Sequence, residues 1–277
     1  MSIRRTALVL SLAVAALAPV ARGDGGGSLG VMQGGPGVVD TDAGVRFVAL
    51  WAGRNTVLAK IRLRGGEVGR SRLLRGWWGL PLVTWGGDAG GLSPDRRLLV
   101  LADETARRPR ATSRFALFDA RKLSAPTLIK LRGDFSFDAL SPDGTRLYLT
   151  QHPSTRDLQR YAVRAYDLGH SRLVRRPVVD PEEPNMRGQP WARVTSRSGS
   201  WVYTLYYGGR EPFVHALDTA HGHARCLDVA WRKRDGKLWR MKLRFFDGGR
   251  KLGFVDRTTG MRARPTLDLH RLDATDS

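Results

Sequence analysis

Short apolar runs, each bounded by turn-forming residues, follow one another along most of the chain. Leu92-Ser93-Pro94-Asp95 precedes the run Leu98-Leu99-Val100-Leu101, and Leu140-Ser141-Pro142-Asp143-Gly144 precedes Leu147-Tyr148-Leu149. Serine, proline, aspartate and glycine in this order suit the four positions of a type I turn, which joins one strand to the next. Sustained helical periodicity over a dozen residues is absent from the sequence, so the pattern predicts an all-β chain.

Weaker copies of this turn precede three further apolar runs, which gives five units in all. The residues expected to form the turns are Gly44, Asp95, Asp143, Gly144, Gly199, Asp235 and Gly236. In four units a later strand ends in aspartate, at Asp119, Asp167, Asp218 and Asp256, whereas the first unit lacks this aspartate. Repeated units of four short strands predict a single β-propeller over residues 38–270, with five blades of four antiparallel strands.

The units resemble the WD40-like repeat of the periplasmic translocation protein B family and of related surface-layer propellers. The hallmark of that repeat is a strand, Ser-Pro-Asp-Gly, a second strand and a later aliphatic-x-Asp. Residues 140–149 and 92–101 carry the closest match, although Arg96 replaces the glycine in the second unit. The resemblance implies a fold that many unrelated activities share, in proteins that mostly bind other proteins or act as envelope scaffolds, and it transfers no catalytic residue.

Residues 1–23 have the features of a secretory signal peptide. A basic pair, Arg4-Arg5, precedes an apolar run from Ala7 to Ala18, and small residues at Ala21 and Gly23 suit cleavage before residue 24. The run is too short to span a bilayer, although an uncleaved anchor is an alternative. Residues 24–37 are rich in glycine and indicate a flexible leader, and residues 271–277 a C-terminal tail. We therefore expect an exported protein, periplasmic or extracellular and associated with the cell envelope.

The charge of the chain is strongly positive. Its 46 lysines and arginines exceed its 26 aspartates and glutamates by 20. Such a field attracts anionic surfaces, but the basic residues are spread along the whole chain, which favours a purely compositional origin. Adhesion to an anionic envelope polymer is the alternative, and nucleic acid is the least favoured partner. The one cysteine, Cys226, excludes an intramolecular disulfide.

Three groups of residues are candidate sites, each with a structural alternative. The tryptophans at 77 and 78 lie between the first two units and would offer a binding face, or fill the core. The dense acidic stretch between the third and fourth units would bind a cation, or form a solvated loop. A histidine pair beside an aspartate has the ligand types for a divalent metal, or forms a surface turn. These groups are Trp77 and Trp78, then Asp180, Glu182 and Glu183, then Asp218, His221 and His223.

Catalytic motifs are absent from the sequence: there is no nucleophile elbow, no phosphate-binding loop and no Cys/His metal spacing, and no cofactor is predicted. The sequence favours a monomeric, non-catalytic binding or scaffold protein of the cell envelope, whose partner is a protein or an anionic envelope polymer. Two alternatives stay open. One is a propeller-type hydrolase or lyase with carboxylates meeting at the central channel, and the other is a basic adhesin for anionic polymers.

Overall fold

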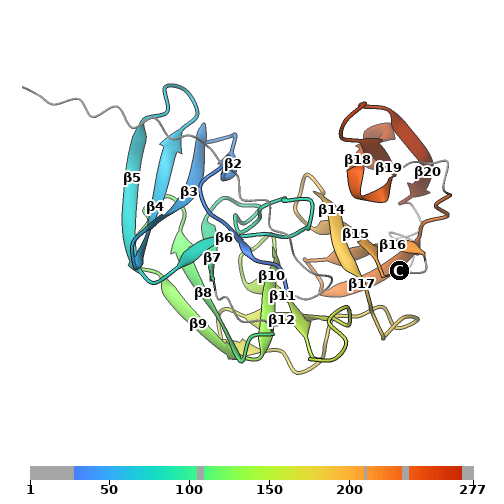
Figure 1. Cartoon of the computed structure of the whole chain (residues 1–277), viewed down its shortest axis with the longest axis horizontal. Helices are drawn as coiled ribbons and strands as arrows, with labels where there is room; N and C mark the ends of the chain where they lie inside the picture. The colour runs from blue at the N-terminus through green and yellow to red at the C-terminus, as the bar shows by residue number, and fades with distance from the viewer. Residues whose placement is uncertain (1–27, 105–108, 209–210, 233–236, 270–277) are drawn as a thin grey trace, which may run out of the picture.

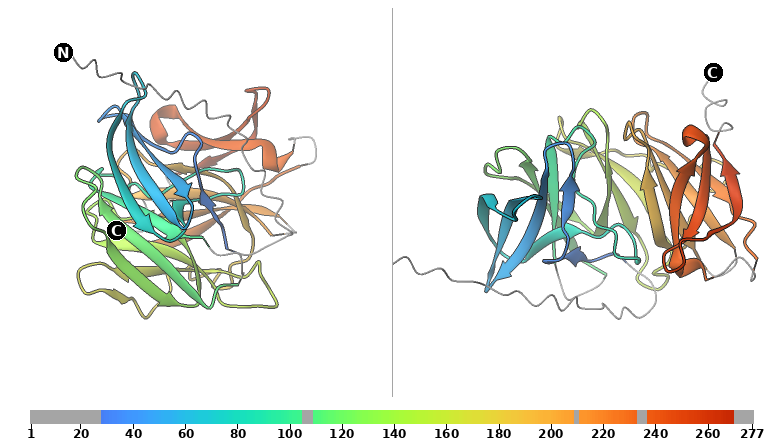
Figure 2. Two further views of the ribbon diagram at one scale, coloured as in Figure 1. Left: turned by 60° about the vertical axis from the view of Figure 1, so that its left-hand side comes forward. Right: turned by 90° about the horizontal axis from the view of Figure 1, so that it is seen from above.

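Five antiparallel sheets make up the computed structural model, which describes residues 28–104, 109–208, 211–232 and 237–269. The sheets follow one another along an arc, with the strands of each sheet ordered from the centre outward (Figure 1). Seen from above, they stand side by side as blades (Figure 2). The predicted all-β, five-bladed propeller is confirmed. Sheets are called first to fifth here, in the order of their longest strands along the chain.

The first sheet contains β2 (Val38–Asp40), β3 (Val45–Ala52), β4 (Asn55–Arg62) and β5 (Val68–Arg75). The second contains β1 (Val31–Met32), β6 (Trp78–Pro81), β7 (Leu98–Asp103), β8 (Thr112–Asp119) and β9 (Thr127–Arg132). The third contains β10 (Asp134–Leu140), β11 (Arg146–His152), β12 (Ala162–Asp167) and β13 (Arg172–Leu173). The fourth contains β14 (Gln189–Thr195), β15 (Trp201–Tyr207), β16 (Pro212–Asp218) and β17 (His223–Asp228), and the fifth β18 (Met241–Phe246), β19 (Lys251–Asp256) and β20 (Arg262–Asp268).

The number of strands departs from four in two sheets. The fifth sheet has three strands among the described residues, preceded by the short 3₁₀ helix η2 (Leu238–Arg240) and interrupted by η3 (Asp247–Gly249). The second has five, because β1 pairs with the inner strand β6 through Val31↔Pro81 and Met32↔Leu80. Residues 28–37, expected in a flexible leader, thus belong partly to the fold. No helix in the described ranges has the length and apolarity needed to span a membrane.

Apolar side chains fill the space between neighbouring sheets in four separate clusters. The cluster between the first and second sheets, for example, contains Phe47, Leu58, Leu99 and Phe118. A strand in such a stack is covered on both faces, which explains why the strands are apolar at successive positions rather than alternating. Each fully buried Leu or Phe contributes roughly 1.5–3 kcal/mol. Among the described residues no cluster joins the fifth sheet to the first, so the stack has two end sheets.

A hairpin inserted between β6 and β7 ties the two halves of the arc together. Leu82 and Ala89 form its bridge, and its tip reaches the fourth sheet, where the amide of Trp85 donates to the carbonyl oxygen of Pro190 at 2.7 Å. Asp88 at its other side forms an ion pair with Arg257 of the fifth sheet at 3.3 Å. The loop between β6 and β7 can be followed in Figure 1, where it lies across the inner strands.

The Ser-Pro-Asp turns are built alike in the second and third sheets. The hydroxyl of Ser141 donates to Asp143 at 2.5 Å and accepts from the amide of Arg146 at 2.9 Å. Gly144 has a φ of +69°, a left-handed conformation that glycine adopts without strain, and Arg96 has a φ of +61° at the same position. The other two turn glycines, Gly44 and Gly199, also have positive φ. Asp235 and Gly236 lie outside the described residues, as do the signal peptide and the C-terminal tail.

Candidate anion-binding site

A similar turn begins the connection between the last two strands of every sheet. In four sheets the turn starts at an aspartate: Asp119, Asp167, Asp218 and Asp256. Asp119 accepts from the amides of Arg121 and Lys122, both at 2.8 Å, and Asp256 accepts from Thr258 and Thr259 at 2.7 and 3.0 Å. The fourth residue after the starting position has positive φ in all five sheets, at Gly66, Leu123, Ser171, Gly222 and Gly260. In these repeated turns the aspartate side chain thus accepts hydrogen bonds from backbone amides of its own turn.

Arg62 occupies the position of this aspartate in the first sheet. It pairs with Val45, the first residue of β3, just as Asp256 pairs with Met241, the first residue of β18. The loops have the same length, since the amide of Arg62 donates to Glu67 at 2.8 Å and that of Asp256 donates to Met261 at 2.9 Å. A guanidinium therefore stands where the other four turns have a carboxylate.

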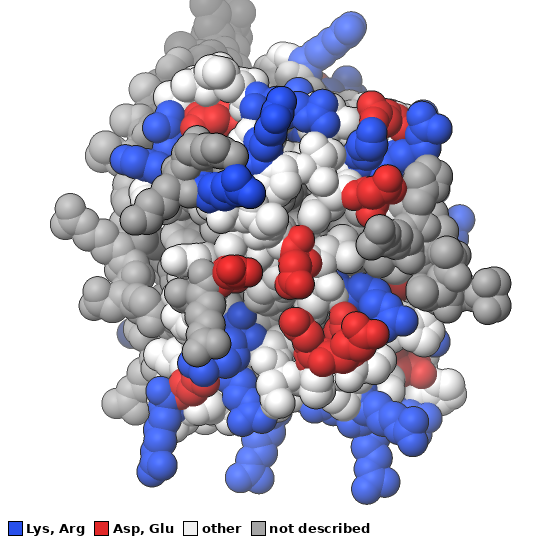
Figure 3. All heavy atoms as spheres, turned by 90° about the vertical axis from the view of Figure 1, so that its right-hand side faces the viewer, with Lys and Arg blue, Asp and Glu red and all other residues white. Residues whose placement is uncertain are grey.

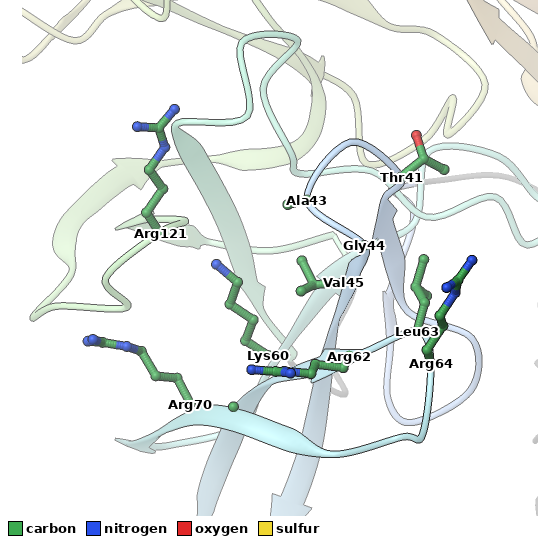
Figure 4. A pocket seen from close by; sticks show the side chains of 11 residues that line it. Thr41, Ala43, Gly44, Val45, Lys60, Arg62, Leu63, Arg64, Arg70 and Arg121 are labelled. Atoms are coloured by element: carbon green, nitrogen blue, oxygen red, sulfur yellow. The ribbon is translucent and has the colours of Figure 1, made fainter.

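This exchange of charge lies in a pocket of about 710 Å³ at the junction of the first and second sheets. The pocket is called the basic pocket below. Its cations come from three places: Lys60 and Arg62 from the end of β4, Arg64 and Arg70 from the loop and start of β5, and Arg121 from the turn after β8 (Figure 4). Thr41, Ala43, Gly44 and Val45 line another wall.

Most of these cations are left without an acidic partner. Lys60 Nζ donates to the carbonyl oxygen of Ala120 at 3.3 Å, and Arg70 donates to that of Lys122 at 3.1 Å, so both side chains bridge the two sheets. Arg62 pairs with Glu67 at 3.5 Å, where both side chains are about two-thirds exposed. Within the described ranges, the other four cations of the pocket have no carboxylate within ion-pair distance. Their charge is available to a ligand.

Backbone hydrogen bonds hold the turn that presents Arg121. The amide of Lys122, followed by that of Arg121, keeps the pKa of Asp119 below its usual value. The amide of Leu123 also donates to the carbonyl oxygen of Asp119 at 2.8 Å. Asp119 therefore stays charged and fixes the backbone from which Arg121 projects, although the Arg121 side chain itself is exposed.

Further cations continue from the pocket along β5, the outermost strand of the first sheet (Figure 1). Leu74 belongs to the apolar cluster between the sheets, and residues two apart on a strand share a face, so Arg72 and Arg70 point to the same side. Arg70 is exposed and Arg72 is half-buried. The first sheet thus lines its outer edge with cations on the side of the second sheet.

The second sheet also carries cations, on its outermost strand β9. Ala116 belongs to the same apolar cluster and pairs with Leu128, so Lys130 and Arg132 share that face. Both are exposed. Together with Arg70 and Arg72 of β5, they are called the cationic rows below.

Of the two tryptophans predicted to offer a binding face, only Trp77 is exposed. Trp78 is 5 % exposed and packs into the cluster between the first and second sheets. Its amide donates to the hydroxyl oxygen of Thr56 at 2.8 Å, and its indole N–H donates to the backbone carbonyl oxygen of Arg75 at 2.9 Å. Trp78 is thus a core residue, because it starts β6 with its side chain turned inward. Trp77 is 54 % exposed and lies beside Trp51, a residue that the sequence analysis did not select.

The acidic loop splits into a buried and an exposed part. Asp180 is 3 % exposed and accepts from the amide of Cys226 at 2.7 Å, which fastens the loop to β17. Burial, with the charge of nearby Glu183, raises the pKa of the Cys226 thiol. Glu182 and Glu183 are exposed. Asp180 thus has a structural role in this geometry.

The proposed metal ligands around Asp218 form one of the repeated turns. His221 Nδ1 lies 2.8 Å from Asp218 Oδ2, and the amides of Ala220 and His221 donate to the other carboxylate oxygen. In the third sheet, His170 and Asp167 repeat this contact at 2.9 Å. His223 lies opposite Asp218 as its strand partner. Throughout the described residues, no group of three or more metal-binding side chains has the geometry to hold an ion.

Towards the inner strands of the third and fourth sheets, ionisable groups are buried. Asp138 is 2 % exposed and bonds to Arg193, whose side chain is 10 % exposed. His215 is 2 % exposed and lies edge-on to the rings of Tyr161 and Tyr206. Burial lowers the pKa of His215 to about 4, so this histidine is neutral near pH 7. The charge of Asp138 is neutralised by Arg193, so this cluster stabilises the junction of the third and fourth sheets.

Charge is mixed on the face that lies to the right in Figure 1. Acidic side chains gather in the middle of that face, with lysines and arginines along its upper and lower edges (Figure 3). The basic pocket differs, because among the described residues only one of its five cations, Arg62, forms an ion pair. Sequence reasoning missed this pocket, since its residues come from two sheets. The signal that could have found it is the missing aspartate of the first unit.

The chain is similar in structure to several solved proteins. The chain is similar to TolB from Acinetobacter baumannii at 13% identity, over 80% of this chain and 51% of that one, with a TM-score of 0.45. It is similar to a functionally unknown protein from Desulfotomaculum acetoxidans DSM 771 at 11% identity, over 87% of this chain and 69% of that one, with a TM-score of 0.50. The β-propeller domain of Myceliophteria thermophila Cps50 (Swd1) is similar at 12% identity, over 84% and 64% of the two chains, with a TM-score of 0.43.

The chain thus spans about half the length of the Acinetobacter TolB. No family model and no curated protein sequence matches it. At these identities the likeness concerns the β-propeller fold, which hosts many unrelated functions.

Proposed function

We propose that this protein is a non-catalytic, exported β-propeller that binds a linear anionic polymer of the cell envelope. The ligand would lie in the basic pocket and along the cationic rows. The observation that carries the proposal is that five cations line one pocket and that, among the described residues, Arg62 alone of them forms an ion pair: Lys60, Arg62, Arg64, Arg70 and Arg121. Export rests on the signal peptide that the sequence predicts.

Electrostatics explains why such a pocket favours a polymer over a small anion. A single surface ion pair contributes only about 0–1 kcal/mol. A chain of repeated anionic groups engages several cations at once, and each further contact is intramolecular once the first has formed. It also releases the counterions condensed on the polymer. Arginine suits carboxylate, sulfate and phosphate groups, because its planar fork donates two parallel hydrogen bonds.

The test compares a pocket variant with a variant of equal charge elsewhere. Arg70→Gln combined with Arg121→Gln removes two cations from the pocket. Arg175→Gln combined with Arg176→Gln removes two exposed cations from the third sheet, after β13. Binding of polyphosphate and of oligogalacturonate is measured by titration calorimetry over a range of salt concentrations.

The pocket variant should bind both polymers at least tenfold more weakly than the wild type. The slope of log K against log salt should become shallower by about two, one for each lost contact. The control variant should keep the wild-type slope and affinity. Equal losses in both variants would show that the net charge of +20, rather than the pocket, attracts the polymer.

A further inference from the structure

Two exposed indole rings lie at the end of the first sheet that is opposite the basic pocket. Trp51 and Trp77 are each 54 % exposed, with ring centroids 6.4 Å apart and planes tilted by 40°. The indole N–H of Trp77 donates to the carbonyl oxygen of Gly53 at 3.2 Å, which fixes the ring against the β3–β4 turn. The carbonyl oxygen of Trp77 accepts from the amide of Glu104 at 2.8 Å. With that N–H used internally, Trp77 offers a ligand its apolar face.

The cationic rows connect the pocket to this tryptophan pair. Gly69 and Arg70, near the start of β5, line the pocket, and the strand ends at Arg75, two residues before Trp77. At about 3.3 Å per residue, the path from Arg70 to Trp77 measures roughly 20 Å. Arg72 lies along it on the first sheet, and Lys130 and Arg132 lie on β9, the outermost strand of the neighbouring sheet. A ligand that lies along this path meets cations first and two aromatic faces at the end.

We propose that the Trp51–Trp77 pair is a sugar-stacking subsite, and that the anionic polymer is an acidic polysaccharide. This inference rests on the proposed function above. A pyranose ring has an apolar face of C–H groups that packs on an indole ring, and its carboxylate or sulfate extends from the ring edge towards the arginines. Polyphosphate offers the charge without an apolar ring. The anionic sugar chain therefore uses both parts of the surface.

Single-stranded nucleic acid is the competing ligand, since its bases stack on aromatic rings and its phosphates bind cations. Base-binding surfaces interleave aromatic and basic side chains along the strand. Here the aromatic rings are confined to one end, and the apolar residue that faces outward between the cations is Leu128, 66 % exposed. The tilt of 40° between the rings also suits sugar units, which rotate about their glycosidic bonds from one ring to the next.

The experiment uses probes that separate charge from stacking. Full-length protein is titrated with a long oligogalacturonate, with its methyl ester, with polyphosphate and with single-stranded DNA, at about 0.15 M salt. The variants are Trp77→Ala and Trp51→Ala. Trp239→Ala is the matched control, because Trp239 is 57 % exposed and lies in η2 beside the fifth sheet. Thermal unfolding checks that every variant folds.

Both tryptophan variants should bind oligogalacturonate about tenfold more weakly and polyphosphate within twofold of the wild type. The control should match the wild type with both polymers. The methyl ester, which has lost its charge, should bind at least tenfold more weakly than the free acid.

Unchanged oligogalacturonate affinity in both tryptophan variants would overturn the stacking subsite while leaving the anion-binding pocket standing. Tighter, tryptophan-dependent binding of DNA would assign the surface to nucleic acid instead. If the Arg70→Gln, Arg121→Gln double variant still binds both oligogalacturonate and polyphosphate with wild-type affinity, the proposed function itself is rejected.

Discussion

Arg62→Asp should separate stability from binding, because it restores the repeated turn and reverses a charge in the pocket. The new carboxylate would accept from the amides of Arg64 and Gly65, which correspond to Thr258 and Thr259 after Asp256. The loop already has the matching length, and Gly66 has the positive φ of Gly260. Gly65 also has a positive φ, of +78°, which the other four turns do not have at this position, so the backbone of the first turn has to adjust for the carboxylate to accept from both amides.

The magnitudes favour a gain in stability. Two backbone hydrogen bonds to a carboxylate contribute about 1 kcal/mol each. The Arg62–Glu67 ion pair, at 3.5 Å and about two-thirds exposed, contributes a few tenths of a kcal/mol, which the substitution loses. Repulsion between the introduced carboxylate and Glu67 costs a similar amount. The net expectation is a gain of about 1 kcal/mol, which raises Tm by roughly 2–4 °C in a chain of this size.

Binding should change in the opposite direction. The substitution lowers the charge of the pocket by two, so affinity for oligogalacturonate should fall at least tenfold while Tm rises. Arg176→Asp, an equal charge reversal at an exposed position in the third sheet, should leave affinity unchanged. A fall in Tm of several degrees would show that the first turn is built differently from the others. Unchanged affinity would refute the role of Arg62 in the pocket.

Three further outcomes are expected. The pKa of buried His215 is lowered to about 4, against about 6.5 in an unfolded chain, so the folded protein should lose stability as the pH falls. The stabilisation from neutral His215 is fully present above pH 6.5, and about 3 kcal/mol of it is lost by pH 4. Chemical denaturation of wild type and His215→Gln should show a flatter dependence of stability on pH in the variant. Gly199→Ala should lower Tm more than Gly44→Ala, because both glycines have positive φ but a Cβ at Gly199 would lie 2.3 Å from the ring of Pro94, whereas Gly44 faces open space; equal losses would exclude this steric contribution. The mature protein should begin at Asp24, and an intact mass that retains residues 1–23 on secreted protein would contradict export.

The repeat made the fold predictable, because each Ser-Pro-Asp turn and each strand-end aspartate is a local device. Ser141 and Asp143 bind their own backbone, so their meaning can be recognised from adjacent residues alone. Pairing between distant residues was not predictable in this way. Val31 joins Pro81 across the inner edge of the second sheet, although its neighbourhood in sequence is rich in glycine.

The candidate site needed the structure for the same reason. Trp77 and Trp78 differ in exposure because Trp78 is the first residue of the buried strand β6 and Trp77 precedes that strand, and the sequence did not show where β6 begins. The basic pocket joins residues from two sheets, so no single segment reveals it. The sequence did contain one local sign, since the first unit has an arginine, Arg62, where the other four have aspartate.

A departure from a repeated local rule is informative when nothing nearby compensates for it. The first turn gives up the hydrogen bonds that aspartate makes in the other four, and Glu67 offers Arg62 only an exposed partner. Natural chains tend to keep such local conflicts at functional sites. The arginine at position 62 therefore favours a binding role, independently of the other residues that line the pocket.

The local density of positive charge, rather than the net charge of the chain, decides which cations bind an anionic polymer at physiological salt. Exposed charges separated by more than about 8 Å are largely screened from one another at 0.15 M ionic strength. Cations scattered over a face that also carries acids, such as that of Figure 3, therefore act singly and hold a polymer weakly. In the basic pocket, Lys60 and Arg70 of one sheet reach the backbone of the turn that carries Arg121, so under the proposed function their charges would act together on one ligand. A composition rich in arginine and a specific anion site are thus compatible in one chain, and the slope of affinity against salt distinguishes the residues that belong to each.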